Sequence, residues 1–352
     1  MRVLVVNAGS SSLKLRLLGA GDELEAEHDL TPDDRDALAA ALAELPMPDA
    51  VGHRVVHGGE RFRDAVLVDD AAVAALTALT DLAPLHQPAA LDGIAAVGRA
   101  LPDVPAVACF DTAFHATLPP AATTYALPQP WRERFGLRRY GFHGLSHAYA
   151  SRRAAAGRVV SCHLGAGASL AAVRDGVCVD TTMGFTPMEG LVMATRSGSV
   201  DPGLVLWLLR HDVSPGAVEQ GLDRDGGLRG LAGDGDMRAL LARDDADARL
   251  ALDVYIHRLR AGIAAMVAAL GGLDALVFTG GVGEHAPEIR ARTAAGLGFL
   301  GVALDEVANA RATADAEIGA PGAAARTIVV TAREDLEVAR GVRLLLARSP
   351  QP

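Results

Sequence analysis

The chain has 352 residues, more than one hydrophobic core usually serves, so two domains are expected. Half of the residues are hydrophobic and 22% are charged, a balance that is typical of a globular protein and argues against long disordered stretches. The net charge of -10 argues against a nucleic-acid partner and an anionic membrane surface, so an anionic ligand would need local basic residues.

Three cysteines, Cys109, Cys162 and Cys178, lack the spacing of a metal site and cannot all pair with one another. Reduced thiols and a cytoplasmic location are the simplest interpretation. The N-terminus enters a strand pattern without the small-residue cleavage site of a signal peptide. The longest apolar helix, which ends over residues 263–270, is too short and too interrupted to span a bilayer.

The first element in chain order is a hairpin over residues 3–17. The apolar run VLVV predicts a buried strand, and the alternation LKLRL predicts a half-buried one. The segment NAGSSS between them offers backbone N–H groups and hydroxyls that can close on an anion, although an ordinary tight turn favours the same residues. A Walker loop is excluded, because no G-x-x-x-x-G-K-[ST] sequence is present.

Arg54 is the first basic residue in an apolar setting. It lies in AVGHRVVHGG (residues 50–59), which reads as a strand that enters a double-glycine turn. Its side chain either extends toward solvent or holds a carboxylate or phosphate. The adjacent glycines favour the second interpretation, because they let a ligand approach the backbone. Helices are predicted on either side of this strand, over residues 36–45 and 69–81.

Asp111 follows a predicted buried strand over residues 104–110. A carboxylate in that place is typical of α/β active sites, and a helix cap or turn is the alternative. The motif YGFHGLSH (residues 140–147) then brings two histidines together. Its His-x-x-x-His spacing is a poor zinc motif, because no glutamate follows the first histidine and Gly144 weakens the helix that the motif needs. A histidine that donates to an anion is the better interpretation.

Residues 159–173 repeat the opening pattern of apolar strand, small-residue turn and strand, and a third strand is predicted over 177–179. A repeat at domain scale predicts two similar halves, each with one phosphate-binding hairpin. Arg196 is a second arginine between small residues. The glycine-rich segment 226–235 is a poor calcium loop, because the carboxylate spacing and closing glutamate are absent.

The last third of the sequence alternates helices and strands. A long helix is predicted over about 249–270, and a buried strand over 275–279 meets GGVGEHAP, where backbone N–H groups gather for an anion or nucleotide. A last strand is predicted over 327–331. The final helix, 336–347, carries Leu344, Leu345 and Leu346, which are predicted to face the core.

Nine motifs occur in order along nearly the whole chain: VLVVNAGSSSLK, GHRVVHGGE, PLHQP, FDTAFH, YGFHGLSH, CHLGAGAS, MGFTPMEG, ATRSGSVDP and FTGGVGE. In these motifs the chain resembles the acetate kinase family, within the actin-like ATPase superfamily that also holds sugar kinases. The resemblance implies an α/β protein with a duplicated ribonuclease-H-like fold and a cleft between two domains. Residues 1–147 with the C-terminal helix 336–352 would form the first domain, and 148–335 the nucleotide-binding domain.

The activity that the resemblance implies is reversible phosphoryl transfer between ATP and a short carboxylate such as acetate. The family's cofactor is Mg²⁺, or Mn²⁺ in its place, and ATP or ADP is the co-substrate. Family members are typically cytoplasmic homodimers. No nucleic acid and no membrane is expected as a partner.

Motif matches also imply the site residues. Asp111, Arg54, Arg196 and His143 match catalytic positions, and His143 and Arg196 would stabilise the transition state. The metal positions match Asn7 and Glu334, with Asp111 a further carboxylate near the ion. The acceptor pocket matches Arg54, Val56, Leu85, Phe142 and Pro187, and His86 and His163 match histidines that line the cleft. The nucleotide and phosphate positions match Ser10, Ser12, Lys14, His163, Leu164, Gly165, Ala166, Gly167, Gly280, Gly281, Val282, Gly283 and Glu284.

Three departures from the family pattern lie on the nucleotide side. Ala166 stands where the family usually has Asn, His285 and Ala286 stand where Asn and Ser or Thr are common, and Arg333 replaces the usual Asn before Glu334. They leave the donor open between ATP, another triphosphate and pyrophosphate. The acceptor is open between acetate and propionate or butyrate, because one methylene in an apolar pocket shifts preference by only about 1–3 kcal/mol.

Two other classes of protein fit the sequence less well than a kinase does. A nucleotide-binding sensor without turnover would have lost the charged residues, but Arg54, Asp111, His143, Arg196 and Glu334 are all present. A metallohydrolase built on the histidines has the wrong spacing.

Overall fold

The computed structural model describes residues 1–9, 12–31, 34–84 and 86–348, and within them it forms two compact units. The first unit comprises residues 1–116, 142–149 and 333 to the C-terminus, and the second comprises 117–141 and 150–332. The predicted division at residue 147 assigned residues 117–141 to the first domain, whereas they group here with the second unit.

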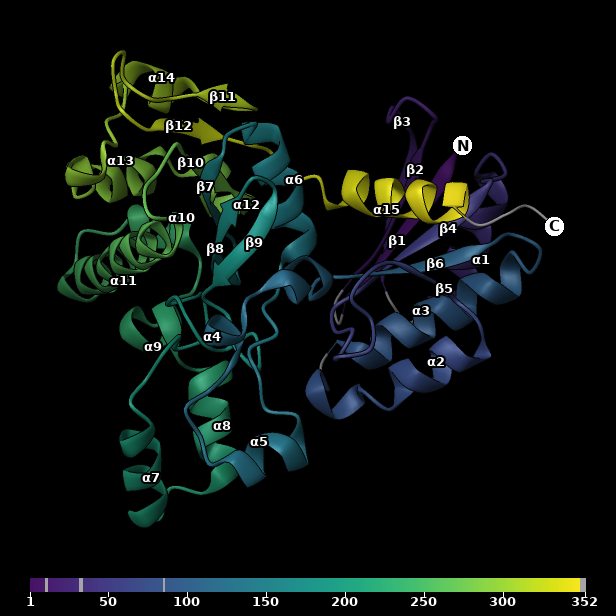
Figure 1. The fold of residues 1–352 in the computed structure, drawn as a ribbon, viewed down its shortest axis with the longest axis horizontal. Helices are drawn as coiled ribbons and strands as arrows, with labels where there is room; N and C mark the ends of the chain where they lie inside the picture. Colours follow the sequence, from purple (N-terminus) through teal and green to yellow (C-terminus); the bar gives the residue numbers. More distant parts are fainter. Residues whose placement is uncertain (10–11, 32–33, 85, 349–352) are drawn as a thin grey trace. The chain divides into compact units, whose positions relative to one another are not determined.

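The first unit is built on a six-stranded mixed sheet. Its strands are β1 (Val3–Ala8), β2 (Leu13–Leu18), β3 (Leu24–Leu30), β4 (Ala50–Val55), β5 (Val66–Leu67) and β6 (Ala106–Phe110), in the order β3-β2-β1-β4-β6-β5 (Figure 1). β1, β4 and β6 are parallel neighbours, and the three remaining strands are antiparallel to theirs. The carboxyl ends of three parallel strands therefore meet at one edge of the sheet.

Helices cover both faces of this sheet. They are α1 (Arg35–Glu44), α2 (Asp70–Thr77), the 3₁₀ helices η1 (Thr80–Leu82) and η2 (Ala113–Thr117), α3 (Gln87–Ala100), the start of α6 (Gly144–Ala154) and α15 (Glu334–Arg348). α15 lies against β1 and β4, where Val338 and Val342 join the core. Gly52 permits this approach, because a Cβ there would lie 2.6 Å from Cγ1 of Val338 and 2.8 Å from Cγ2 of Val342. The C-terminal helix is thereby fixed on the strand that carries Arg54.

The second unit repeats this plan. Its strands are β7 (Arg158–Leu164), β8 (Ala168–Arg174), β9 (Val177–Thr181), β10 (Ala275–Thr279), β11 (Ala316–Glu317) and β12 (Arg326–Val329), in the order β9-β8-β7-β10-β12-β11. Read from the three-stranded antiparallel side, this order matches that of the first sheet strand by strand, with β7, β10 and β12 as the parallel strands. The predicted duplicated α/β fold is confirmed.

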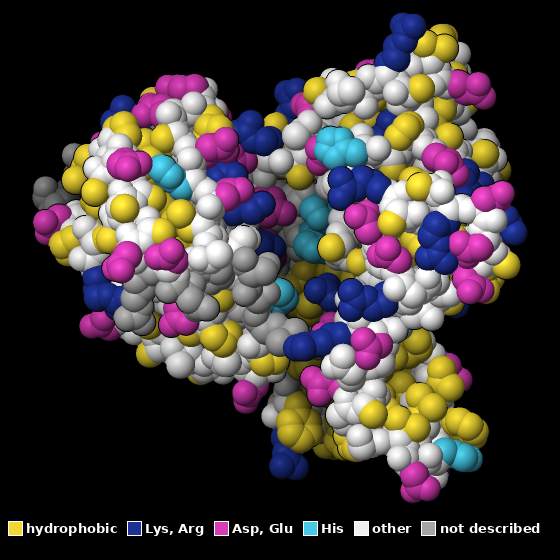
Figure 2. Space-filling view, turned by 180° about the vertical axis from the view of Figure 1, so that it is seen from behind, with side chains coloured by type: hydrophobic (Ala, Val, Ile, Leu, Met, Phe, Trp, Pro, Cys, Tyr) yellow, Lys and Arg dark blue, Asp and Glu magenta, His cyan; other side chains and the backbone are white. Residues whose placement is uncertain are grey.

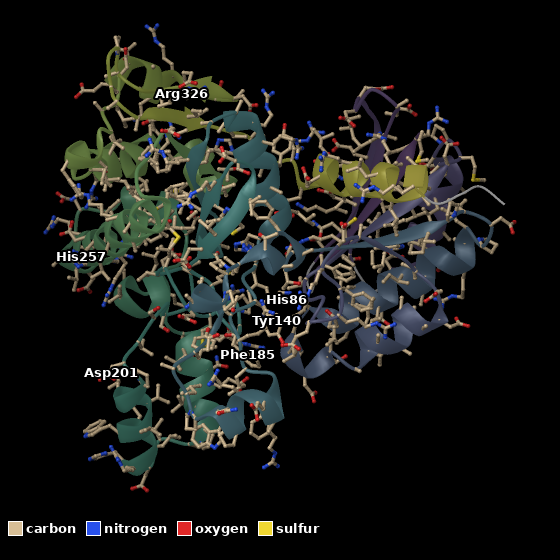
Figure 3. All side chains as sticks on the ribbon, viewed as in Figure 1. His86, Tyr140, Phe185, Asp201, His257 and Arg326 are labelled. Carbon is tan, nitrogen blue, oxygen red and sulfur yellow. The ribbon has the colours of Figure 1, made fainter. Side chains whose placement is uncertain are left out.

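Eleven helical segments belong wholly to the described part of the second unit: α4 (Pro120–Thr123), α5 (Gln129–Phe135), α7 (Pro202–Arg210), α8 (Pro215–Asp223), α9 (Gly227–Ala232), α10 (Met237–Leu241), α11 (Ala246–Leu270), α12 (Gly280–His285), α13 (Pro287–Ala295), η3 (Gly298–Leu300) and α14 (Glu306–Arg311). The 25-residue α11 packs on β7, β8 and β9. The rings of Tyr140 and Phe185, labelled in Figure 3, lie 5.9 Å apart in this unit. No helix among the described residues is long and apolar enough to cross a membrane.

Candidate active site

Asn7, Arg54 and Asp111 are brought together by the parallel strands of the first unit. Asn7 lies near the end of β1 and pairs in register with Arg54 on β4, and Asp111 follows the last residue of β6. Side chains that leave the carboxyl ends of adjacent parallel strands meet at the same edge, where α/β folds place ligands. Each of these residues is among the predicted site residues, and the parallel pairing of β1, β4 and β6 explains why they are neighbours.

The guanidinium of Arg54 lies at the centre of this group. Its Nη2 donates to Asp111 Oδ2 at 2.5 Å, its Nε donates to Asp111 Oδ1 at 3.4 Å, and its Nη1 donates to Asn7 Oδ1 at 3.2 Å. Burial opposes the charge of Arg54, but the charges of Asp111 and Glu334 outweigh it and raise its pKa. The side chain of Arg54 is only 20% exposed, so it does not extend into solvent, and its binding of a ligand's carboxylate or phosphate stays a prediction.

Glu334 completes the group from the last helix. It is the first residue of α15, and its Oε2 lies 3.5 Å from Nε of Arg54. The neighbouring Arg333, one of the departures from the family pattern, donates to the carboxylate of Asp335 at 2.8 and 2.9 Å. Hydrogen bonding to that carboxylate raises the pKa of Arg333. Asp111, Glu334 and Arg54 together give this group of side chains a net charge of -1, which suits the binding of a cation.

His143 belongs to a turn that is bonded to Asp111. Its φ of 56° is left-handed, a conformation that non-glycine residues rarely adopt. The amide of Gly144 donates to the carbonyl of Asp111 at 2.9 Å, and the amide of His147 donates to the carbonyl of His143 at 2.9 Å. His143 itself is half-buried. The turn and the aspartate are therefore fixed to each other through the main chain.

The remaining predicted residues of the first unit differ in burial and in contacts. Phe142 is buried with its ring edge-on to His57, and Val56 and His86 are half-buried. Ser12 accepts from Gly9 through its carbonyl at 2.8 Å, and the exposed Lys14 pairs in register with Asn7. Two further predicted residues, Ser10 and Leu85, lie outside the described residues.

In the second unit, the two predicted nucleotide turns lie at one edge of the sheet. His163 ends the parallel pairing of β7 with Thr279 of β10, and each strand runs directly into its turn. The turn over 163–167 is closed by a bond from the Gly165 amide to the Gly167 carbonyl at 2.9 Å. Gly280 has a φ of 77°, and a Cβ there would lie 2.8 Å from the carbonyl oxygen of Leu164. Only glycine lets the two turns approach so closely.

Ala166, at the tip of the first turn, is exposed, and its carbonyl accepts from the amide of Ala194 at 3.0 Å. The other turn continues into α12, which holds Gly281, Val282, Gly283 and Glu284. Glu284 accepts from the amide of Ala332 through Oε1 at 3.0 Å, and His285 is exposed. The departures at 166 and 285 therefore alter surface side chains and leave the backbone of both turns intact.

Arg196 is anchored by the second unit in a way that sequence analysis did not foresee. Its Nη1 donates to the carbonyl of Pro187 at 3.2 Å, so two predicted site residues are in contact. Its Nε lies 3.3 Å from Oδ1 of Asp223, the last residue of α8. No local pattern in the sequence marks Asp223. It lies 27 positions after Arg196, and only the tertiary structure brings the two side chains together.

Solved structures of kinases that act on short carboxylates share this duplicated α/β fold. The structure of *Porphyromonas gingivalis* acetate kinase matches with a TM-score of 0.91 and 33% identity, over 98% of this chain and 99% of that one. A propionate kinase from *Francisella tularensis* matches with a TM-score of 0.90 and 34% identity, over 97% and 98%.

Sequence relatives give the family. The model of the Acetokinase family matches residues 33–340. An acetate kinase of *Nostoc punctiforme* is 50% identical over 318 residues, 87% of this chain and 78% of the relative, and one of *Thermotoga maritima* is 40% identical over 99% of both chains. The chain belongs to the acetate kinase family.

Proposed function

We propose that the chain transfers the γ-phosphoryl group of ATP directly to acetate, giving acetyl phosphate and ADP, and catalyses the reverse reaction. The observation that carries the proposal is the guanidinium of Arg54, which is held by Asn7 and Asp111 at the ends of three parallel strands and by Glu334 at the start of α15. Acetate is ionised at neutral pH, so the attacking oxygen needs no general base. The protein's task is then to align two anions and to stabilise their charge.

The proposed roles follow from charge. Arg54 binds the acetate carboxylate, because a guanidinium fork matches a carboxylate in two hydrogen bonds. Arg196 and His143 donate to the equatorial oxygens of the phosphoryl group during transfer. Removing one such donor typically costs about 3–4 kcal/mol of transition-state stabilisation. Asp111 holds Arg54 in the orientation that the carboxylate requires.

Mg²⁺ is part of the proposal, and the residues suit it. Asn7, Glu334 and Asp111 supply hard oxygen donors around a group of net charge -1. The described residues contain no cluster of three or more His, Cys, Asp or Glu that could hold a metal ion. That agrees with Mg²⁺, which usually takes one or two protein carboxylates together with substrate phosphates and water. Asn7 and Glu334 would hold the ion, which would neutralise charge on the phosphates.

The nucleotide phosphates are proposed to bind the two turns of the second unit, residues 163–167 and 280–284. Two observations support this placement: both turns follow neighbouring parallel strands, β7 and β10, and the turns approach each other closely at Gly280. The opening turn, with Ser10, Ser12 and Lys14, is proposed to contact the transferred phosphoryl group. The turn over 163–167 keeps its backbone hydrogen bond despite Ala166. ATP is proposed as the donor because the chain belongs to the acetate kinase family.

The acceptor pocket is proposed to comprise Val56, Leu85, Phe142 and Pro187, all apolar. Propionate is the second candidate acceptor, because a propionate kinase is 34% identical over nearly the whole chain. A panel of acetate, propionate and butyrate against ATP, GTP and pyrophosphate separates these cases by kcat/KM. The proposal expects acetate and ATP to give the highest value, and a higher value for another pair would replace them.

The direct test uses purified protein with millimolar acetate, ATP and Mg²⁺, and traps the acyl phosphate with hydroxylamine. We expect acyl phosphate to accumulate throughout the reaction, in proportion to the ADP that is released. Folded protein that gives none would refute the activity. Arg196→Ala is expected to lower kcat by roughly 100-fold or more. Full activity in that variant would remove Arg196 from the site.

A homodimer is also proposed, with α7 at its interface. No residue of this nine-residue helix is buried, and its large hydrophobic side chains Leu206 and Trp207 are 56% and 49% exposed. Figure 2 shows hydrophobic side chains gathered at the end of the second unit that α7 forms. Light scattering is expected to give twice the monomer mass, and Trp207→Glu to give a monomer. The matched control is Leu250→Glu, at an exposed leucine of α11.

A reducing, cytoplasmic location is the last part of the proposal. All three cysteines are buried. Burial raises the pKa of the Cys109 thiol to about 12, so it is poorly suited to disulfide exchange. Fractionation of the source cells checks this location, and recovery with the membranes would contradict it.

A further inference from the structure

His115 is a buried histidine to which neither the motif matches nor the proposed mechanism gives a role. It lies in η2, four residues after Asp111, and its side chain is fully buried. Its ring lies edge-on to the rings of Phe114 and His147, with centroids 5.6 and 5.9 Å away. Its Nε2 lies 2.9 Å from the carbonyl oxygen of Phe142. The residue therefore connects the segment after β6 with the turn that carries His143.

The direction of this hydrogen bond can be assigned. Burial lowers the pKa of His115 to about 4, against the opposing effect of the bond to Phe142, so the ring is neutral at pH 7. A carbonyl oxygen can only accept, so the hydrogen lies on Nε2 and His115 is the donor. The bond thus has one defined tautomer and one defined direction across the physiological range.

The bond lies next to a backbone conformation, that of His143, which a non-glycine residue rarely adopts. His143 follows Phe142 directly and has a φ of 56°. Such a conformation persists where the surrounding structure over-determines it. Two bonds do so here: the carbonyl before His143 accepts from His115, and the amide after it, that of Gly144, donates to Asp111. The second of these bonds depends on the main chain alone, whereas the first depends on one side chain.

We propose that His115 is a positioning residue, which orients His143 toward the transferred phosphoryl group by holding the carbonyl of Phe142. This rests on the proposed role of His143 as a donor in the transition state. The residue touches neither substrate in this account. Its effect is on the orientation of His143, so it acts on kcat and leaves the binding of acetate and ATP nearly unchanged.

The test compares two substitutions of His115. His115→Gln keeps a donor near the place of Nε2, and His115→Phe keeps a ring and removes the donor. We expect His115→Phe to lower kcat by about 10- to 100-fold with little change in either KM, as misplacement of a catalytic group does. We expect His115→Gln to recover most of that loss. Equal loss in both variants, or a loss confined to KM, would overturn the proposal.

A double-mutant cycle with His143→Ala separates orientation from general weakening of the fold. If His115 acts through His143, His115→Phe lowers kcat by less than about 2-fold when His143 is already absent. The same 10- to 100-fold loss in both backgrounds would mean that His115 serves only the fold.

A measurement that does not depend on catalysis distinguishes the proposed role of His115 from the proposed role of His143. Hydrogen exchange of the His147 amide, which donates to the carbonyl of His143, reports on the turn itself. It is expected to be faster in His115→Phe than in His115→Gln. If His143→Ala keeps full kcat, the proposed role of His143 fails, and with it the catalytic consequence of His115. Unchanged exchange in His115→Phe would overturn the positioning role even if His143 is catalytic.

Discussion

The main-chain carbonyl of Asp111 accepts from the amide of Gly144 at 2.9 Å, so the proposed catalytic aspartate and the His143 turn are joined without any side chain. A Cβ on Gly144 would lie 2.1 Å from that same carbonyl oxygen and 2.9 Å from Cβ of Phe114. The contact is with backbone, which cannot turn aside as the end of a long side chain can. Glycine at 144 is therefore required by the packing of Asp111.

Gly144→Ala is expected to lower the free energy of unfolding by about 3 kcal/mol, as overpacking does, and to reduce kcat by displacing Asp111 or His143. Urea unfolding and the hydroxylamine assay measure the two effects. The control is Gly98→Ala in α3, an exposed helical position where a Cβ meets nothing within 4 Å. That change should stabilise the protein by about 0.5–1 kcal/mol. Wild-type stability and activity in Gly144→Ala would contradict the argument.

Hydrophobic pattern was enough to predict the buried strands, because β1, β6 and β10 are apolar runs. It was not enough for β3, whose sequence LEAEHDL has charges on alternate positions. That strand is held by its neighbour: Arg16 on β2 lies 3.0 Å from Glu27 and 2.7 Å from Asp29. Cross-strand pairing of this kind cannot be read from a single segment.

The prediction that three successive leucines of the last helix face the core was wrong in part. Leu345 and Leu346 pack against the core, but Leu344 is 41% exposed. Successive residues of a helix are about 100° apart, so three of them cover too wide an arc for one buried face. Predicting which one is exposed requires the direction from which the sheet meets α15.

Arg54→Lys is expected to lower kcat/KM for acetate by roughly 100-fold while it changes the free energy of unfolding by about 1 kcal/mol or less. Lysine keeps the charge between Asp111 and Glu334 but lacks the fork that reaches Asp111, Asn7 and a carboxylate together. Steady-state kinetics and urea unfolding measure the two effects.

The matched control is Arg2→Lys, because Arg2 pairs with Glu25 at 2.6 Å on the surface of the same unit. An exposed pair contributes about 1 kcal/mol at most, so this variant should keep wild-type kinetics and stability. Equal kinetics for Arg54→Lys and Arg2→Lys would show that only the charge of Arg54 matters.

The stability of the protein is expected to fall as the pH decreases from about 6.5 toward 4. Burial lowers the pKa of His53, His57 and His115 to about 4 each, against about 6.5 in the unfolded chain. Between these values the unfolded state binds more protons, so the free energy of unfolding rises with pH, by up to about 1.4 kcal/mol per pH unit for each histidine. Urea unfolding at several pH values measures the slope.

His53→Met should reduce that slope by one histidine's share and should not destabilise the protein at pH 5. The ring of His53 is 2% exposed, and its Nε2 has no hydrogen-bond partner among the described residues, so an apolar replacement leaves no new polar group unpaired. His257→Gln is the control for the loss of an exposed histidine, at a position of α11 that Figure 3 labels. A wild-type slope in His53→Met would contradict the assignment.

The motifs proposed the residues of the candidate site but not their partners. They pointed to Arg54 and Asp111 separately, and the direct ion pair of these two residues depends on the parallel pairing of β4 with β6. Asp223 and Arg290 carried no signal, and His115 lies in the FDTAFH motif without a role of its own, because each acts on a segment that only the tertiary structure brings near. The sequence thus indicated candidate catalytic positions, which stay predictions, while the contacts that hold those residues in place became visible only in the fold.

Arg290 on α13 is fully buried, and all four of its hydrogen bonds go to carbonyl oxygens. It donates to the main-chain carbonyls of Gly283 at 2.9 Å and Glu284 at 2.7 Å, and to both the side-chain and main-chain oxygens of Asn309 at 2.7 Å. It therefore anchors the end of α12, the proposed nucleotide segment, to α14. Burial lowers the pKa of this guanidinium, so its charge is retained at a cost that those four acceptors offset.

Arg290→Met is expected to lower the free energy of unfolding by about 3–5 kcal/mol, because it leaves buried carbonyl oxygens without donors. It should also raise KM for ATP more than KM for acetate, since the loosened segment is on the nucleotide side. Arg292→Met is the control: Arg292 is on the same helix and pairs on the surface with Asp253 at 2.7 Å. Exposed pairs contribute little, so the control should lose about 1 kcal/mol at most. If Arg290→Met and Arg292→Met unfold at the same urea concentration, or if KM for acetate rises most, Arg290 does not hold the nucleotide segment.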